Sequence, residues 1–154
     1  MNAEGKGALD DVDKRIIEQL QQDGRRPYTQ IAPAVGLSEA AVRQRVQRLI
    51  DSGVMQIVGV TDPKMVGYGR QAMIGLSVEG DTRKIADAVA ALDEVVYVVL
   101  TAGSLDILVE VVVKDDEGLL DLLNNKIRTI EGVRDTETFM YLRLTKQTYT
   151  WGTR

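Results

Sequence analysis

Hydrophobic side chains recur at three- and four-residue intervals in the first third of the chain, and glycine interrupts the pattern at each break. This spacing places the apolar residues on one face of a helix. The pattern predicts three helices, over residues 10–22, 28–35 and 38–52. Asp10 and Ser38 stand where side-chain caps are favoured, whereas Pro27 occupies the cap position of the second helix. Pro33 removes a hydrogen bond inside that helix, so we expect it to be short, kinked or partly 3₁₀.

The periodicity changes after Gly53. Residues 54–60 alternate as a strand does, which predicts a β-wing beside the three helices. From residue 71 onward the pattern runs strand, helix, strand, and then repeats. The predicted strands cover 72–79, 95–101, 106–114 and 133–144, and the predicted helices cover 82–92 and 118–130. Two such units joined by a hairpin form a ferredoxin-like βαββαβ fold, with both helices on one face of an antiparallel sheet.

These elements predict an α+β protein with a winged helix-turn-helix domain followed by a ferredoxin-like αβ-sandwich domain. We expect a disordered tail over 1–8, the first domain over 9–60, a linker over 61–70, the second domain over 71–147 and a C-terminal tail over 148–154. Trp151 lies in that last segment, which either docks on a neighbouring subunit or is mobile.

Apolar residues in two of the predicted strands are too many for a sheet face that stays open to solvent. They are Val96, Val98, Leu100, Ile107, Val109, Val111 and Val113. We expect a partner subunit to cover the face that the helices leave free, so the protein should be at least a dimer. Glu110, in the same strands, is expected to make a hydrogen bond at an edge or an interface rather than to act in catalysis.

Composition excludes several classes of function. The chain contains no Cys and no His, which removes disulfides, the usual zinc ligands and His-based catalysis. We therefore expect no enzyme, no metal site and no cofactor. No apolar run approaches the roughly 20 residues that span a bilayer, and the polar, glycine-containing start is unlike a signal peptide. A cytoplasmic protein that binds no membrane is expected.

The net charge of −4 argues mildly against a nucleic-acid partner, but the acidic excess lies in the second half of the chain. Residues 1–60 hold eight Lys or Arg against eight Asp or Glu. Five of those cations are the arginines at 25–26 and 43–48. Basic side chains are therefore concentrated on and near the third predicted helix, as a DNA-binding domain requires.

The second and third predicted helices, joined by a Gly-Leu-Ser turn, have the form of a helix-turn-helix. Val42, Val46 and Leu49 would hold the third helix in place, and its opposite face carries Arg and Gln, which suit guanine and adenine edges. We expect contacts with double-stranded DNA from Ser38, Glu39, Arg43, Gln44 and Gln47, and phosphate contacts from Arg25, Arg26, Arg45 and Arg48. An ordinary solvated surface helix is the alternative for this segment alone.

Several short motifs follow one another through the first domain. They are Leu9-Asp10-x-x-Asp13-x-x-Ile16, Asp23-Gly24-Arg25, Ile31-Ala32, Val35-Gly36-Leu37-Ser38, Val42-x-x-Arg45-Val46-x-x-Leu49, Gly53-Val54 and Asp62-Pro63. In this order they resemble the Lrp/AsnC (feast/famine) family of transcription regulators, and the likeness extends over residues 9–147. The resemblance implies a second domain that senses amino acids, and a dimer that assembles further to a tetramer or octamer.

The turn Gly103-Ser104-Leu105-Asp106 looks like that family's Gly-x-x-Asp signature. The resemblance implies an effector site between subunits, formed by Thr101, Gly103, Ser104 and Asp106 with Thr136, Glu137 and Thr138 from another subunit. A carboxylate such as Asp106 suits an α-ammonium group, and free backbone N–H groups suit a carboxylate. A plain hairpin is the alternative, because a tight turn calls for a residue with positive φ and Asp often fixes turn geometry.

Two functions follow from these features. The first is a sequence-specific transcription regulator that responds to an amino acid or a related small effector. The alternative is an architectural DNA-compacting protein, or a stand-alone amino-acid-binding module without sequence-specific regulation. The ratio of specific to non-specific DNA affinity at a stated salt concentration separates them.

Overall fold

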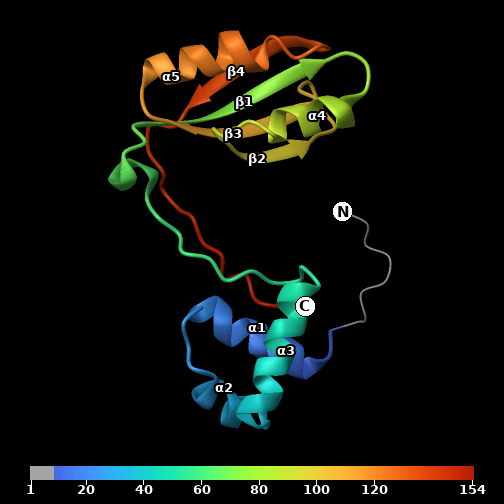
Figure 1. Ribbon diagram of the computed structural model, residues 1–154, viewed down its shortest axis with the longest axis vertical. Coiled ribbons are helices and arrows are strands. Elements are labelled where there is room, and N and C mark those ends of the chain that lie inside the picture. Colours follow the sequence, from blue (N-terminus) through green and yellow to red (C-terminus); the bar gives the residue numbers. More distant parts are fainter. Residues whose placement is uncertain (1–8) are drawn as a thin grey trace. The chain divides into compact units, whose positions relative to one another are not determined.

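The N-terminal helices form as predicted, to within one residue at each end. The computed structural model describes residues 9–154 and contains α1 (Asp11–Gln22), α2 (Tyr28–Val35) and α3 (Glu39–Asp51) in this region (Figure 1). The Asp10 side chain accepts a hydrogen bond from the Asp13 N–H at 2.7 Å, and Ser38 accepts one from the Ala41 N–H at 3.2 Å. Both predicted caps are therefore confirmed. The disordered tail expected over 1–8 lies outside the described residues.

The buried faces of these helices meet in one hydrophobic core. Its fully or nearly fully buried members are Ile16, Ile17, Leu20, Ile31, Ala32, Val35, Val42, Val46 and Leu49. α2 is short, as expected, and it stays α-helical through Pro33, which lies on its exposed side. Gly36 ends it with φ of +75°, a left-handed conformation that glycine adopts without strain. The turn into α3 follows directly, which gives the helix-turn-helix its sharp corner.

The predicted wing strand over 54–60 is wrong. Within residues 9–154 no strand is formed there, and the side chains of Ile57 and Val58 are exposed. A strand needs a neighbour to pair its backbone N–H and C=O groups, and alternation of side chains alone does not supply one. The linker that follows contains a 3₁₀ turn, η1 (Pro63–Val66), which the Asp62 side chain caps.

The second unit confirms the predicted βαββαβ arrangement. Its elements are β1 (Arg70–Val78), α4 (Thr82–Ala90), β2 (Val95–Leu100), β3 (Ile107–Val113), α5 (Asp116–Asp121), the π-helix η2 (Leu122–Ile127) that continues α5, and β4 (Val133–Met140). The strands form one antiparallel sheet in the order β2-β3-β1-β4. This order is that of a ferredoxin-like fold. β4 ends four residues earlier than predicted, and the chain then leaves the sheet.

One sheet face is covered by α4, α5 and η2, and the strand residues that point to it form the core of this unit. They include Val98, Ile107, Val109, Val111 and Val113. The expectation that these residues face away from the helices is therefore wrong. The strand positions between them form the open sheet face, whose apolar members are Met73, Tyr97, Val99, Leu108, Val112 and Phe139. Alternation separated the two faces along β3 but not at the start of β2, where a bulge between Val95 and Tyr97 leaves Val96 exposed, and it could not say which face the helices cover.

The chain divides into two compact units in a way that differs from a simple N-terminal and C-terminal split. Residues 61–145 form the second unit, and the first unit contains residues up to Val60 together with Lys146–Arg154. The C-terminal tail is therefore grouped with the helix-turn-helix.

Candidate nucleic-acid interface and effector turn

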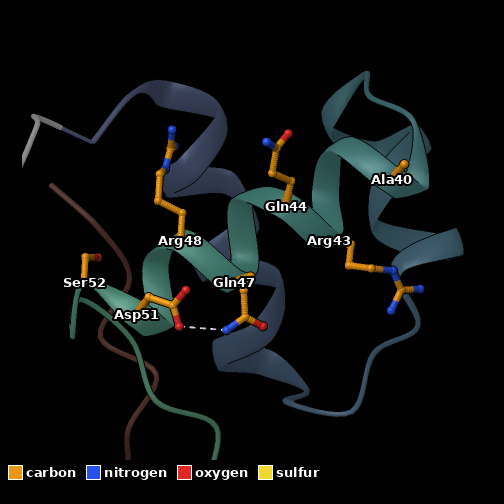
Figure 2. A pocket seen from close by; sticks show the side chains of 7 residues that line it. All are labelled: Ala40, Arg43, Gln44, Gln47, Arg48, Asp51 and Ser52. Carbon is orange, nitrogen blue, oxygen red and sulfur yellow. Dashed lines mark hydrogen bonds between the residues drawn. The ribbon is translucent and has the colours of Figure 1, made fainter.

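The exposed face of α3 carries a row of long polar side chains. Figure 2 shows them extending from the helix, and together they border a shallow hollow lined by Ala40, Arg43, Gln44, Gln47, Arg48, Asp51 and Ser52. Its long side chains Arg43, Gln44, Gln47 and Arg48 are all exposed. Because Val42, Val46 and Leu49 are buried on the other side, the helix presents donors and acceptors outward from a fixed position.

Two of the predicted reading residues are held by neighbours on or beside α3. The Arg43 guanidinium donates to the Glu39 carboxylate at 2.8 Å and lies 5.1 Å from the centre of the Tyr28 ring. Gln47 donates to Asp51 at 2.8 Å. These contacts are exposed and weak, so a base edge can compete for the same groups. Tyr28 was not among the predicted site residues; its place at the start of α2 gave no signal of a contact with α3.

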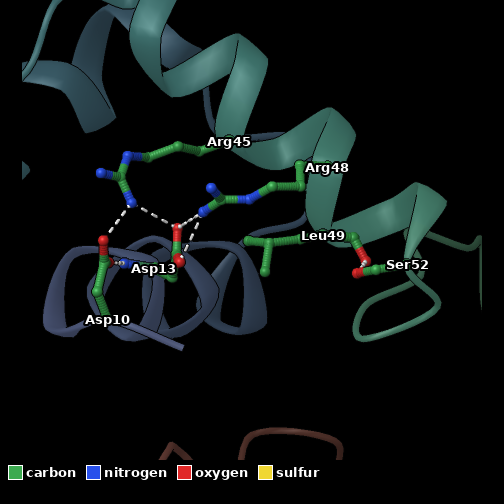
Figure 3. A network of polar contacts seen from close by, with 6 residues as sticks. All are labelled: Asp10, Asp13, Arg45, Arg48, Leu49 and Ser52. Carbon is green, nitrogen blue, oxygen red and sulfur yellow. Dashed lines mark hydrogen bonds and ion pairs between the residues drawn. The ribbon is translucent and has the colours of Figure 1, made fainter. Parts of the chain in front are cut away.

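A network of ion pairs ties α3 to α1 (Figure 3). Asp13, only 3% exposed, accepts hydrogen bonds from Arg45 at 2.8 Å and from Arg48 at 2.8 Å. Arg45 also donates to Asp10 at 2.6 Å. The Asp13 N–H and the Arg45 guanidinium hold the pKa of Asp10 below its usual range, and Asp10 and Asp13 raise the pKa of Arg45.

This network explains why a carboxylate is buried in the first unit. A buried charge is costly unless it is paired and hydrogen-bonded, and Asp13 is served by two guanidinium groups. In the sequence, Asp13 stands out only as a member of the motif Leu9-Asp10-x-x-Asp13-x-x-Ile16. A further signal was present, because the two acids and the two arginines are each three residues apart and so share a helix face.

The remaining basic residues predicted at the interface lie between α1 and α2. Arg25 is exposed, and its N–H is fixed by the Asp23 side chain at 2.9 Å. Arg26 is half-buried and donates to the side chain of Gln19. Both belong to the same compact unit as α3.

The predicted effector turn, residues 101–106, connects β2 to β3 and is fastened to β1. The Asp106 N–H donates to the Leu76 carbonyl at 2.8 Å, and one Asp106 carboxylate oxygen accepts from the Val78 N–H at 2.8 Å. The Thr101 hydroxyl donates to the Leu105 carbonyl. Asp106 therefore fixes the turn with one oxygen, while the structure records no hydrogen bond to its second oxygen from residues 9–154.

The other predicted effector residues lie on β4, on the far side of β1. Thr136, Glu137 and Thr138 pair with Leu76, Gly75 and Ile74, whereas Ile107 at the end of the turn pairs with Leu76 from the opposite side. Two strand spacings separate the groups, about 10 Å. A single chain places both groups at the same end of the sheet but does not bring them into one cluster.

Gly103 is not explained by the geometry of the turn. Its φ is not positive, unlike that of Gly36, Gly53, Gly67, Gly80, Gly132 and Gly152. A Cβ added at Gly103 would meet no atom of residues 9–154 within 4 Å, apart from its two chain neighbours. The plain-hairpin interpretation is therefore wrong for Gly103, although it holds for Asp106.

Glu110 lies on β3, a central strand, with its side chain on the open sheet face. It accepts a hydrogen bond from Gln71 at 2.7 Å. Burial raises the pKa of the neighbouring Tyr141, and the Glu110 charge raises it further. Because β3 lies between β2 and β1, Glu110 is not on a sheet edge, and of the two predicted locations only an interface on the open face remains.

No helix within residues 9–154 is long and apolar enough to cross a membrane. Over the same residues, no group of three or more His, Cys, Asp and Glu side chains is placed to hold a metal ion.

Two family models match the chain. The model of the AsnC-type helix-turn-helix domain matches residues 9–50, and that of the Lrp/AsnC ligand binding domain matches residues 71–151. The chain belongs to the Lrp/AsnC family of transcriptional regulators. The HTH-type transcriptional regulator FL11 of Pyrococcus furiosus is 37% identical to it, over 93% of this chain and 95% of that protein. This Lrp/AsnC regulator is thus a DNA-binding protein with a ligand-binding domain, and the expectation of a regulator rather than an enzyme is confirmed.

Solved structures agree with this placement. The leucine response regulatory protein LrpA of Mycobacterium tuberculosis superposes with a TM-score of 0.82 at 30% identity, over 90% of this chain and 96% of that one. A transcriptional regulator of Neisseria meningitidis, solved in complex with L-Met, gives a TM-score of 0.80 at 26% identity, over 93% and 96% of the two chains.

Proposed function

We propose that this regulator reads a specific DNA sequence with the exposed face of α3 and alters its assembly or DNA binding when an amino acid or related small effector binds. The first half rests on how α3 is fixed. Its inner face is buried, and its outer face is polar. Asp13 on α1 binds Arg45 and Arg48 of α3, an arrangement that we call the clamp. A helix held in this way presents its side chains to the major groove without first having to be ordered.

We assign the outer side chains to two kinds of contact, with base edges and with phosphates. Arg43, Gln44 and Gln47 are suited to paired hydrogen bonds with base edges, and each good pair is worth about 1–3 kcal/mol of discrimination. Ser38 and Glu39, at the start of α3, adjoin them. Phosphate contacts fall to the flanking arginines, Arg25, Arg26, Arg45 and Arg48. A guanidinium has five N–H donors, so those bound to Asp13 keep donors for a phosphate.

The open sheet face supports self-association. Six apolar side chains remain exposed or half-buried on it in the single chain, and a second copy brings the same apolar surface to a two-fold contact. We place a dimer here, with pairing of dimers to a tetramer or octamer as the family resemblance implies. As a regulator that acts on DNA, the protein is assigned to the cytoplasm.

The effector site is placed at the 101–106 turn. Three observations support it: a ligand-binding family model matches this region, a similar regulator from Neisseria meningitidis was solved with L-Met, and within residues 9–154 neither the φ of Gly103 nor its neighbours require a glycine. A glycine that neither the backbone nor its neighbours require fits a close approach by a ligand or by another subunit. Asp106 would receive the α-ammonium on its second oxygen, and Thr136, Glu137 and Thr138 would come from a different subunit.

Gly103→Ala tests this site because the isolated chain tolerates a methyl group there. We expect unchanged thermal stability of the folded protein and an affinity for amino acids lowered about ten-fold or more, measured by calorimetry against a panel that includes L-methionine. Gly80→Ala is the control. Its φ of +98° makes this change destabilising, but the affinity for amino acids should be kept, because Gly80 lies in the turn between β1 and α4 and not in the 101–106 turn. If Gly103→Ala binds the panel as the natural protein does, the effector site lies elsewhere.

The architectural alternative is tested with DNA. Fragments selected from genomic DNA should share a roughly two-fold symmetric site, and binding to that site should exceed binding to random DNA by about 10³ or more. Equal affinity for both at the same salt concentration would favour a DNA-compacting protein.

A further inference from the structure

The C-terminal tail, residues 146–154, contacts α1. The Gly152 N–H donates to the Gln21 side chain at 3.0 Å, and the Thr153 hydroxyl donates to the Glu18 carboxylate at 2.5 Å. Gly152 and Thr153 are half-buried, whereas every residue from 142 to 151 is exposed. Glu18 and Gln21 are three residues apart, so they face the tail from the same side of the helix. The contact is therefore local to one pair of tail residues and one helix face.

The tail sequence is suited to this contact. Gly152 has φ of +75°, a left-handed conformation that only glycine adopts readily, and this lets its N–H and the next side chain both meet α1. The tail also carries Lys146 and Arg154 and no acidic residue, a charge balance that favours its contact with Glu18. Within the tail, the ring centres of Tyr149 and Trp151 lie 6.4 Å apart.

We propose that the tail is part of the helix-turn-helix unit: residues 146–154 bind the Glu18–Gln21 side of α1 in the same chain, so the chain passes between the two units a second time. β4 ends at Met140, and only residues 141–145 separate it from the tail. The helix-turn-helix domain is thus joined to the other domain by the linker after α3 and by the tail. α1 in turn holds α3 through Asp13, so the tail reaches the element that supports the reading helix.

Engineered disulfides test the contact directly, because the natural chain has no Cys. In the variant Glu18→Cys with Thr153→Cys, the two thiols replace side chains that touch. We expect a disulfide within one chain, which migrates as a monomer on a denaturing gel without reductant, formed at least ten times faster than in the control Asp11→Cys with Thr153→Cys. Position 11 lies on α1 about 10 Å from position 18, beyond the reach of a disulfide.

Two results would overturn the proposal. Equal rates in the two variants would show that the tail does not dock on this face. Cross-linked dimers in place of monomers would show that the tail belongs to the α1 of a second copy. Neither result depends on a ligand or on DNA, so each is separate from a failure of the proposed function.

A truncated chain that ends at Gln147 measures what the contact does. We expect backbone amides of α1 to exchange with solvent about ten times faster than in the full chain, the change expected for losing two hydrogen bonds. Amides of β1 and β3 should keep their rates. Unchanged exchange in α1 would mean that the tail is no part of the helix-turn-helix domain, and the proposal would be wrong.

Discussion

Replacing Arg45 and Arg48, which pair with Asp13, should lower the free energy of unfolding more than replacing Arg45, Arg48 and Asp13 together. Arg45→Ala with Arg48→Ala leaves a carboxylate that is 3% exposed without a cation. Breaking a buried ion pair from one side costs about 3–5 kcal/mol. Adding Asp13→Ala removes the stranded charge, so we expect the triple variant to regain about 1–3 kcal/mol of that loss.

The assay is denaturation by guanidinium, followed by the circular dichroism of the helices. Arg43→Ala is the matched control, because it breaks an exposed i,i+4 pair on the same helix and should change the free energy of unfolding by less than about 1 kcal/mol. A triple variant that is less stable than the double variant would refute the reasoning. Asp13 would then contribute to stability without its arginines, and the clamp would not explain why it is buried.

Three further outcomes are expected. Arg25→Ala should weaken binding to all DNA alike and lower the slope of log affinity against log salt by about one. Arg43→Ala should lose about 1–3 kcal/mol of binding free energy on the specific site only. Titrations at several salt concentrations would show both effects. Leu108→Glu, on the open sheet face, should give a folded monomer in sedimentation experiments; a dimer of unchanged affinity would place the interface elsewhere. A hydrogen bond from Lys126 holds the pKa of Glu94 below its usual range, so this pair stabilises the fold above the ordinary carboxyl pKa, and the benefit is lost as pH falls through the lowered pKa. Lys126→Met should flatten the acid limb of a profile of stability against pH.

The sequence predicted those parts of the fold that depend on neighbours along the chain. The caps at Asp10 and Ser38 and the stripe of Val42, Val46 and Leu49 form as expected, because a helix is decided by residues three and four apart. The wing over 54–60 failed because a strand depends on a partner that the local pattern does not contain.

The candidate site was predicted in the same uneven way. The polar face of α3 follows from helical spacing, and the structure places Arg43, Gln44 and Gln47 on it. The pairing of Asp13 with Arg45 and Arg48 was not predicted, because Arg45 and Asp13 are 32 residues apart and only packing brings them together. The assignment of sheet faces failed for the same reason: strand register is a long-range property, and a bulge between Val95 and Tyr97 shifts it locally.

Two residues of the ligand-binding domain, Gly103 and Glu110, have types that the packing of the single chain does not require. Gly103 needs no glycine for its backbone or its surroundings, and Glu110 is a carboxylate placed in the middle of an apolar sheet face. Glu110 has the side chain of Gln71 as a hydrogen-bond partner on this face, yet a charged residue among apolar ones is expected where a partner adds further contacts. The two positions also differ in the contact they allow, because a glycine leaves room for a close approach and a glutamate offers a charged group. We therefore expect Gly103 to mark a close approach, and Glu110 to mark a polar contact that sets how two subunits register across the sheet.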